Sequence, residues 1–244
     1  MRFDLHIHSC LSPCGDLEMS PRAIVERARA AGLDGIALTD HNSARNTPAL
    51  EECACGTGLR CLFGLEINTA EELHTLALFD TTSQALEMTG WVYDGLPKRV
   101  NQPEVFGDQP VVDADETIIE LEWRLLSAAT RHPLHAISAE AHRLGGLLIA
   151  CHVDRPVFSV FARLGVLSGD EGFDAMELGR TALESEWRTR TLPHPLIRSS
   201  DSHYLADVGT AWTEADLSEF SIAELRAAFL RGTVVPGPPW QRTK

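Results

Sequence analysis

Two histidines stand at the end of the first strand-like segment of the chain, Asp4-Leu5-His6-Ile7-His8-Ser9. Residues i and i+2 of a strand point to the same side, so His6 and His8 can present two imidazoles to one point in space. Such a pair suits a metal ion, and a metal ion needs more ligands than two side chains supply. The chemistry predicted here therefore depends on further ligands from distant parts of the chain.

Other candidate ligands stand at the ends of later strand-like segments. They are Asp40, His41, Glu66, His152, Asp201 and His203. Imidazoles and carboxylates together match Zn²⁺, Mn²⁺ or Fe²⁺. A single histidine at a strand end is usually structural, whereas several of them, with HxH and DxH pairs among them, favour one shared metal site. His74 begins a strand-like segment, and its short sequence distance from Glu66 keeps it among the candidates.

The segments that must position these residues alternate between strand and helix. Strands are predicted at residues 35–39, 60–67, 74–79, 147–151, 173–178 and 197–200, and Ser20 and Ser221 are predicted to cap helices. This alternation favours parallel βαβ units. In a parallel α/β barrel the carboxyl ends of the strands open onto one face, which would bring scattered ligands together. Apolar residues over 116–130 predict a further helix.

Composition sets limits on the partners. The chain has 244 residues, 44% of them hydrophobic, and a formal net charge of -14. Such a charge repels long duplex nucleic acid, whereas small anionic substrates remain possible where bound metals reverse the local sign. No secretory signal and no apolar run of roughly 18 residues is visible. We therefore expect a cytoplasmic protein without membrane contact, whose cysteines are reduced thiols.

Taken in order, these segments resemble the motifs of the PHP family, the polymerase and histidinol phosphatase superfamily of metal-dependent phosphoesterases. The motifs are Asp4 to Ser9, Leu38 to Asn42, Gly64 to Ile67, the strand from His74, the strand ending at His152, and Ser200 to His203. The resemblance spans residues 4–203. It implies an α/β fold with a distorted (β/α)7 TIM-like barrel. It also implies a single PHP domain over residues 1–244, in which residues 80–140 form a loop or helical insertion beside the active site.

The resemblance also implies two or three divalent metal ions, zinc, manganese or iron. One would be held by His6, His8, Glu66 and Asp201; Glu66 would bridge to a second, completed by His74 and His152; and His41 and His203 would hold a third. Family members usually add an Asp or His from the loop after the HxH pair. Here Asp16 is the predicted ligand, with Cys14 as its competitor. Asp40 is predicted to orient a ligand histidine. Arg155 either reaches a substrate phosphate or is an ordinary surface arginine.

A chain of this kind is predicted to be a metal-dependent phosphoesterase that hydrolyses a small phosphorylated substrate with metal-activated hydroxide. A nucleotide, a nucleoside bisphosphate, or a sugar or amino-alcohol phosphate would fit. The alternatives are a nuclease acting on short oligonucleotides, a noncatalytic domain stabilised by its metals, and amidohydrolase chemistry on a related barrel. The last has no obvious carboxylated lysine, because the lysines are Lys98 and Lys244.

Overall fold

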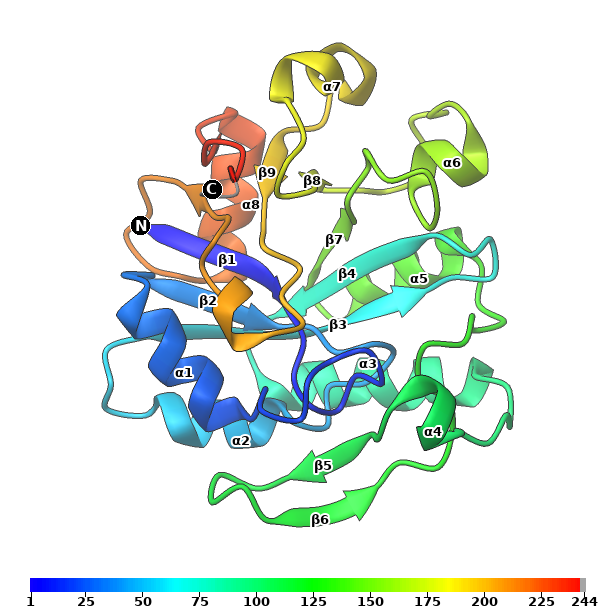
Figure 1. Cartoon of the computed structure of the whole chain (residues 1–244). Coiled ribbons are helices and arrows are strands. Elements are labelled where there is room, and N and C mark those ends of the chain that lie inside the picture. Colours follow the sequence, from blue (N-terminus) through cyan, green and yellow to red (C-terminus); the bar gives the residue numbers. More distant parts are fainter. Residues whose placement is uncertain (242–244) are drawn as a thin grey trace.

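The computed structural model describes residues 1–241 and shows a sheet wrapped into a nearly closed barrel with helices around it (Figure 1). In these residues nine strands form the main sheet, in the order β11-β10-β1-β2-β3-β4-β7-β8-β9. They are β1 (Arg2–Ile7), β2 (Gly35–Leu38), β3 (Arg60–Asn68), β4 (His74–Phe79), β7 (Leu147–Ala150), β8 (Ala175–Leu178), β9 (Leu196–Arg198), β10 (Thr213–Glu214) and β11 (Val235–Pro236). The predicted α/β barrel is confirmed.

Helices cover both the outside and one end of the barrel. They are α1 (Pro21–Ala30), α2 (Thr47–Ala54), α3 (Thr82–Gly95), α4 (Pro103–Phe106), α5 (Leu134–Arg143), α6 (Val160–Leu164), α7 (Glu184–Thr191) and α8 (Ile222–Arg231), with a 3₁₀ turn at Leu205–Asp207. Ser20 and Ser221 cap α1 and α8 through their side chains, as predicted. Leu225 and Phe229 of α8 pack into the core formed by the inward side chains of the strands.

The strand β4 runs antiparallel to both of its neighbours, β3 and β7. Parallel pairing is found for β1-β2-β3 and for β7-β8-β9, so the expectation of parallel units throughout is wrong at β4. Only residues 69–73 connect β3 to β4, and a parallel crossover needs a dozen residues or more. His74, paired with Asn68, therefore lies at the edge where the parallel strands end.

A register shift in β1 turns its two histidines toward the barrel interior. Phe3 and Leu5 pack in the inner core, but Ile7 packs among residues that face the helices. Strict alternation would have placed Ile7 on the same side as Phe3 and Leu5. The pairing of β1 with β2 shifts just before Ile7, and the shift directs His6 and His8 inward.

The chain beyond β9 closes the barrel against β1. The backbone N–H of His8 donates to the Ser202 carbonyl at 3.0 Å, and that of Ser202 donates to the His6 carbonyl at 3.3 Å. The buried Asp4 carboxylate accepts a hydrogen bond from the Ser200 N–H at 3.0 Å and another from the Ser200 hydroxyl at 2.5 Å. Segments some 200 residues apart in the sequence thus lie side by side.

The helix predicted over 116–130 is wrong. Strand β6 (Ile118–Leu121) pairs there with β5 (Pro110–Val112) in a separate two-stranded sheet. Ile118 and Ile119 are exposed, so no packing partner rewards a helical apolar stripe, and their β-branched side chains favour a strand. The predicted insertion over 80–140 thus contains this hairpin as well as α3, α4 and the start of α5.

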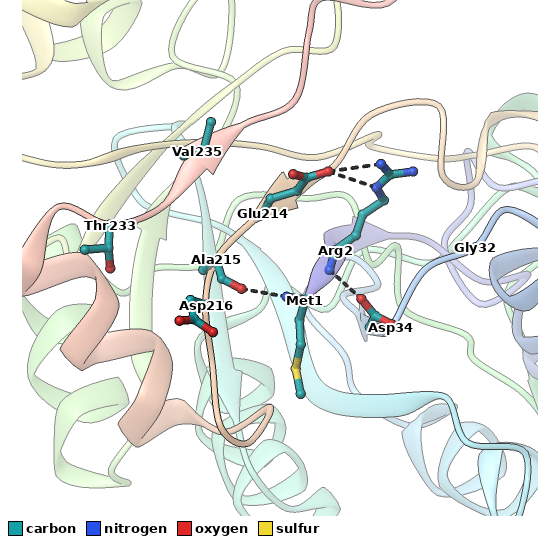
Figure 2. A pocket seen from close by; sticks show the side chains of 9 residues that line it. All are labelled: Met1, Arg2, Gly32, Asp34, Glu214, Ala215, Asp216, Thr233 and Val235. Carbon is teal, nitrogen blue, oxygen red and sulfur yellow. Dashed lines mark hydrogen bonds and ion pairs between the residues drawn. The ribbon is translucent and has the colours of Figure 1, made fainter.

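The other end of β1 borders a hollow of about 570 Å³, shown in Figure 2. Its polar groups hold strands together. The N-terminal amine donates to the Ala215 carbonyl at 2.6 Å, and Arg2 pairs with Glu214 at 3.0 Å. The Arg2 N–H donates to Asp34 at 2.7 Å. The buried histidines His6 and His8 lie at the opposite end of β1. No helix within residues 1–241 is long and apolar enough to cross a membrane, and the expected cytoplasmic location stays a prediction.

Candidate metal centre

The carboxylate of Glu66 lies at the centre of a buried histidine cluster at the end of β3. Its two oxygens lie within 3.5 Å of ring nitrogens from several strands. These are His74 Nδ1 at 2.8 Å, His41 Nδ1 at 2.9 Å, His152 Nε2 at 3.3 Å, His6 Nε2 at 3.4 Å and His8 Nε2 at 3.5 Å. A carboxylate has about four lone-pair positions and cannot bond all of these rings well. The arrangement suits a carboxylate that bridges two metal ions.

Asp201 completes the side of the cluster next to β1. Its Oδ1 lies 3.4 Å from His6 Nε2 and 3.3 Å from His8 Nε2, while those two nitrogens are 3.1 Å apart. The backbone of Asp201 has φ +51, and that of His152 has φ +29. Such left-handed conformations are strained in residues other than glycine, and here they aim two side chains into the cluster. Arg155, at the mouth, forms an ion pair with Asp201.

The start of β4 contributes His74, whose backbone and ring both contact Phe158. The N–H of His74 donates to the Phe158 carbonyl at 2.8 Å, and the two rings stack with centroids 4.7 Å apart. Phe158 also has positive φ and leaves 41% of its surface exposed. An aromatic ring therefore lies at the rim of the cluster.

Asp40 does not contact the other carboxylates or the ring nitrogens of the cluster; it acts through a serine. Its carboxylate accepts the Ser12 hydroxyl at 2.7 Å and the Ser9 N–H and hydroxyl at 2.7 and 2.6 Å. Ser12 in turn lies 2.9 Å from His8 Nδ1. The Ser12 hydroxyl donates its hydrogen to Asp40, so its oxygen accepts a hydrogen bond from Nδ1–H of His8. This bond leaves Nε2 of His8 directed at the cluster. Burial raises the pKa of Asp40, although these hydrogen bonds oppose it.

Glu177, at the end of β8, contacts His6 and His152 on the side away from Glu66. The sequence alone did not assign it a role. It lies 2.9 Å from His6 Nδ1 and accepts the N–H of His152 at 3.0 Å. The bond to Nδ1 turns His6 Nε2 toward Glu66, as Ser12 does for His8. The sequence signal that could have identified Glu177 is its position near the end of a predicted strand, a position that the predicted ligands share.

The loop after β1 brings Cys14, and not Asp16, to the histidines. A ligand atom from each of Cys14, His8, His41 and His203 lies within 4.8 Å of the others. Asp16 lies outside every such group in the described residues, and its carboxylate accepts the Glu18 N–H at 2.8 Å instead. The prediction of Asp16 as loop ligand is therefore not supported by this geometry, and its competitor Cys14 is in place.

Neighbouring charges shift the pKa values of Glu66 and His6 at the centre of the cluster. Burial alone would raise the pKa of Glu66, but His74, His6 and His41 hold it well below its usual range. Burial likewise opposes protonation of His6, yet Glu177, Asp201 and Glu66 raise its pKa well above the ordinary value.

The two cysteines beside the cluster differ in ionisation. Burial would raise the pKa of Cys14, but His41 and His203 lower it to about 6. Burial and the carboxylates raise the pKa of Cys151 well above its ordinary value. Cys14 is thus the more acidic of these two thiols.

The donor set fits divalent metal ions. It consists of imidazoles and carboxylates, which bind zinc, manganese and iron. Nδ1 of His41 is buried and has no hydrogen-bond partner within residues 1–241, although it lies 2.9 Å from Glu66. The Nε2 atoms of His6 and His8 face each other at 3.1 Å with their other nitrogens already bonded. Ring nitrogens that are directed at one space in this way are suited to coordinate a cation, which would displace the protons that they carry.

Known proteins resemble this chain in sequence and in fold. The family model described as PHP domain matches residues 4–155, and one described as PHP-associated matches residues 188–234. A 5'-3' exoribonuclease of Haemophilus influenzae is 36% identical over 85 residues, which are 33% of this chain and 30% of that protein. The chain spans less than half the length of the curated relatives that it matches.

Solved structures share the fold. The lesion-specific endonuclease EndoQ of Pyrococcus furiosus aligns with a TM-score of 0.69 and 19% identity, covering 97% of this chain and 58% of that one. A complex of Endonuclease Q with a 27-mer duplex aligns equally well. A proposed metal-dependent phosphoesterase of Bifidobacterium adolescentis aligns with a TM-score of 0.56 and 20% identity, covering 82% of this chain and 87% of that one.

Proposed function

Because the chain belongs to the PHP domain family, we propose that it hydrolyses the phosphoester of a small phosphorylated molecule at the cluster around Glu66. The observation that carries this proposal is the contact of one buried carboxylate with ring nitrogens from β1, β4 and the ends of β2 and β7, beside Asp201. Metal-dependent hydrolase chemistry is common to the family and its structural neighbours. The phosphoester and its size are the proposal.

Two metal positions follow from the contacts. His6, His8, Glu66 and Asp201 would hold one ion, and Glu66, His74 and His152 would hold the other. Divalent ions at these positions would supply an activated water at neutral pH and draw charge from the phosphoryl oxygens. Glu177 and the Ser12–Asp40 pair position His6 and His8 by bonding their outward nitrogens. Zinc, manganese and iron all suit these donors.

Arg155 is the residue that we assign to the substrate phosphate. Its side chain is 46% exposed at the mouth of the site and pairs with Asp201. A guanidinium can donate to two phosphoryl oxygens at once. Arg155 lies in the segment after β7 that also carries His152.

Phe158 favours a substrate that carries a flat ring. One face of Phe158 stacks on His74, and its exposed surface lies at the rim of the site. Base–aromatic stacking contributes roughly 1–3 kcal/mol per base. Among the candidate substrates, this favours nucleotides and nucleoside bisphosphates over sugar or amino-alcohol phosphates.

A nuclease acting on short oligonucleotides is the second candidate. It is favoured by the similarity to a protein named as an exoribonuclease and by the fold shared with EndoQ. The exclusion of duplex DNA rests on the net charge of -14 alone, and the structural similarity to a duplex-bound endonuclease gives it no support.

The test is a hydrolysis screen of the purified protein loaded with Zn²⁺ or Mn²⁺. Nucleoside monophosphates, nucleoside bisphosphates, sugar phosphates, short oligonucleotides and duplex DNA are compared at equal phosphoester concentration. We expect phosphate release from nucleotides that is lost in His8→Ala and Asp201→Ala. Cleavage of oligonucleotides without release from mononucleotides would favour the nuclease. Full metal content without hydrolysis of any phosphoester would overturn the proposal.

A further inference from the structure

We propose that Asn42 is a positioning residue that couples the metal centre to residues 126–130, here called the rim segment. The rim segment belongs to the chain between β4 and α5, and it is bonded to residues that follow β2 and end β3. Neither Asn42 nor the rim segment supplies a candidate ligand. The inference rests on the proposed function for the location of the metal ions, but its test does not depend on hydrolysis.

Asn42 joins the turn that carries His41 to the strand that carries Glu66. Asn42 is fully buried, and its backbone N–H donates to the Glu66 carbonyl at 2.8 Å. Its Oδ1 accepts the Asn68 N–H at 3.2 Å. The backbone of Asn42 has φ +51, a left-handed conformation that asparagine adopts more readily than most other residues. The bonds at Asn42 therefore fix the turn between two candidate ligands, His41 and Glu66.

The amide nitrogen of the same side chain holds the rim segment. Nδ2 of Asn42 donates to the Leu126 carbonyl at 2.6 Å and to the Ala128 carbonyl at 2.8 Å. Both hydrogens of the amide are used in this way, and neither a carboxylate nor an aliphatic side chain could supply them. One buried side chain thus bonds the end of β3 through its oxygen and the rim segment through its nitrogen.

Asn68, the last residue of β3, makes a second connection to the rim segment. Its Nδ2 donates to the Ser127 carbonyl at 3.1 Å, and its carbonyl accepts the Thr130 N–H at 2.8 Å. Asn68 lies two residues after Glu66 and pairs with His74 across β3 and β4. The rim segment is therefore bonded to the chain next to three candidate ligands.

Packing makes these connections stiff. Leu126 is buried in an apolar cluster with Leu96, Val111 and Leu11, the last of which lies in the loop after β1. A displacement of the rim segment would disturb this close-packed cluster as well as the bonds to Asn42. Ions that fix His41 and Glu66 should therefore stabilise the rim segment, and by linkage the rim segment should strengthen ion binding by the same factor.

Hydrogen exchange of the whole chain, read by mass spectrometry with and without Zn²⁺, tests this coupling. We expect zinc to slow exchange over residues 126–130 about tenfold in wild type. Residues 113–117 are the internal comparison, because the N–H groups of Asp113, Asp115 and Thr117 bond within that turn. Exchange there should be the same with and without zinc.

Asn42→Gly removes the amide but leaves the turn conformation accessible, since glycine adopts positive φ readily. In the metal-free variant, exchange over residues 126–130 should be about tenfold faster than in wild type, because the two bonds from Nδ2 are lost. Zinc should slow it less than in wild type. In a direct titration the variant should bind zinc about tenfold more weakly.

Asn101→Gly is the matched control. Asn101 is also buried, but its Nδ2 donates to the Gly107 carbonyl at 2.8 Å, a contact that does not involve the barrel strands. This variant should lose stability in urea and keep the zinc affinity of wild type. Circular dichroism of the metal-free proteins checks that each variant folds.

Three results would overturn the inference. One is wild-type exchange over residues 126–130 that zinc does not slow, or slows no more than at residues 113–117, and this measurement needs no variant. The others are unchanged zinc affinity in Asn42→Gly and an equal loss of affinity in Asn101→Gly. Coupling without hydrolysis of any phosphoester would sink the proposed function and leave this inference standing. Hydrolysis without coupling would do the reverse.

Discussion

The hydroxyl of Ser12 lies 2.9 Å from Nδ1 of His8, on the side of the ring that faces away from Glu66. Ser12 donates to Asp40 at 2.7 Å, so the chain from Asp40 through Ser12 sets which nitrogen of His8 carries hydrogen. Neither Asp40 nor Ser12 is a proposed ligand. Their effect on the metal centre is therefore one of positioning, and it can be measured.

Ser12→Ala should weaken metal binding or activity about 10- to 100-fold, because His8 loses the partner that orients its ring. Zinc titration and kcat/KM for the best substrate of the screen measure the two effects. Ser199→Ala is the control, since Ser199 is a buried serine whose hydroxyl has no hydrogen-bond partner in the described part of the chain. Equal behaviour of the two variants would contradict the positioning role.

Glu66→Gln should abolish hydrolysis and remove metal from both proposed positions. The amide keeps the size of the side chain but cannot bridge two cations with two anionic oxygens. Metal content by elemental analysis and hydrolysis of the best substrate provide the readout. Glu120→Gln, a change at an exposed glutamate of β6, should retain both properties. Retention of two metals in Glu66→Gln would rule out the bridging role.

Arg155→Ala should raise KM about tenfold with little change in metal content, through loss of a charge-assisted hydrogen bond to phosphate. Arg163→Ala offers a comparison on α6, where Arg163 donates to the Glu71 carbonyl at 2.8 Å. If Arg155→Ala lowers metal content instead, the residue serves Asp201 and not the substrate.

Phe158→Leu should raise KM for a nucleotide by at least about fivefold, because it removes a stacking surface worth roughly 1–3 kcal/mol. Leucine keeps an apolar contact with His74. It has to adopt the same positive φ as Phe158, so the backbone conformation is the same in both proteins. KM for a phosphoester without an aromatic group should not change. A parallel loss for both substrates would show that Phe158 only supports His74.

The pH dependence of stability should report on Asp4. Burial raises its pKa from 3.8 to about 6, against the hydrogen bonds from Ser200. The folded protein therefore holds this proton more tightly than the unfolded chain. The stability contribution is complete below about pH 4 and is lost as pH rises through 6. The change amounts to about 3 kcal/mol over the whole window.

Urea unfolding of metal-free wild type and Asp4→Asn from pH 4 to pH 7.5 isolates this contribution. The difference in free energy of unfolding, wild type minus variant, should fall as pH rises, because asparagine does not titrate. The lost hydrogen bonds add an offset that does not depend on pH. A difference that stays constant across the window would mean that Asp4 is not protonated near pH 6.

Much of the site was readable from residue types at strand ends. Apolar runs followed by His152, Asp201 or Glu66 marked where buried strands stop, and such positions gather at one face of a barrel. Helix starts at Ser20 and Ser221 were also local signals, because a cap bonds an N–H three residues away. These features depend on neighbours in sequence, so no tertiary contact was needed to predict them.

Other features depend on which distant segments meet. The direction of β4 explains how His74, at the start of a strand, joins residues at strand ends, and a register shift explains the inward turn of His6 and His8. The failed helix at 116–130 has the same origin, since Ile118, Ile119 and Leu121 are exposed, whereas Leu126 packs with residues of other segments.

The sequence by itself determined the types of the candidate ligands and their order along the chain. The tertiary structure decided which loop residue reaches them, Cys14 in place of Asp16, and which buried groups hold them from behind, Glu177 and Ser12. The physical reason is the sequence distance over which each property is determined. Residue type and local backbone preference depend on only a few neighbouring residues. A hydrogen bond such as that from Asp16 to His203 exists only once the barrel has closed.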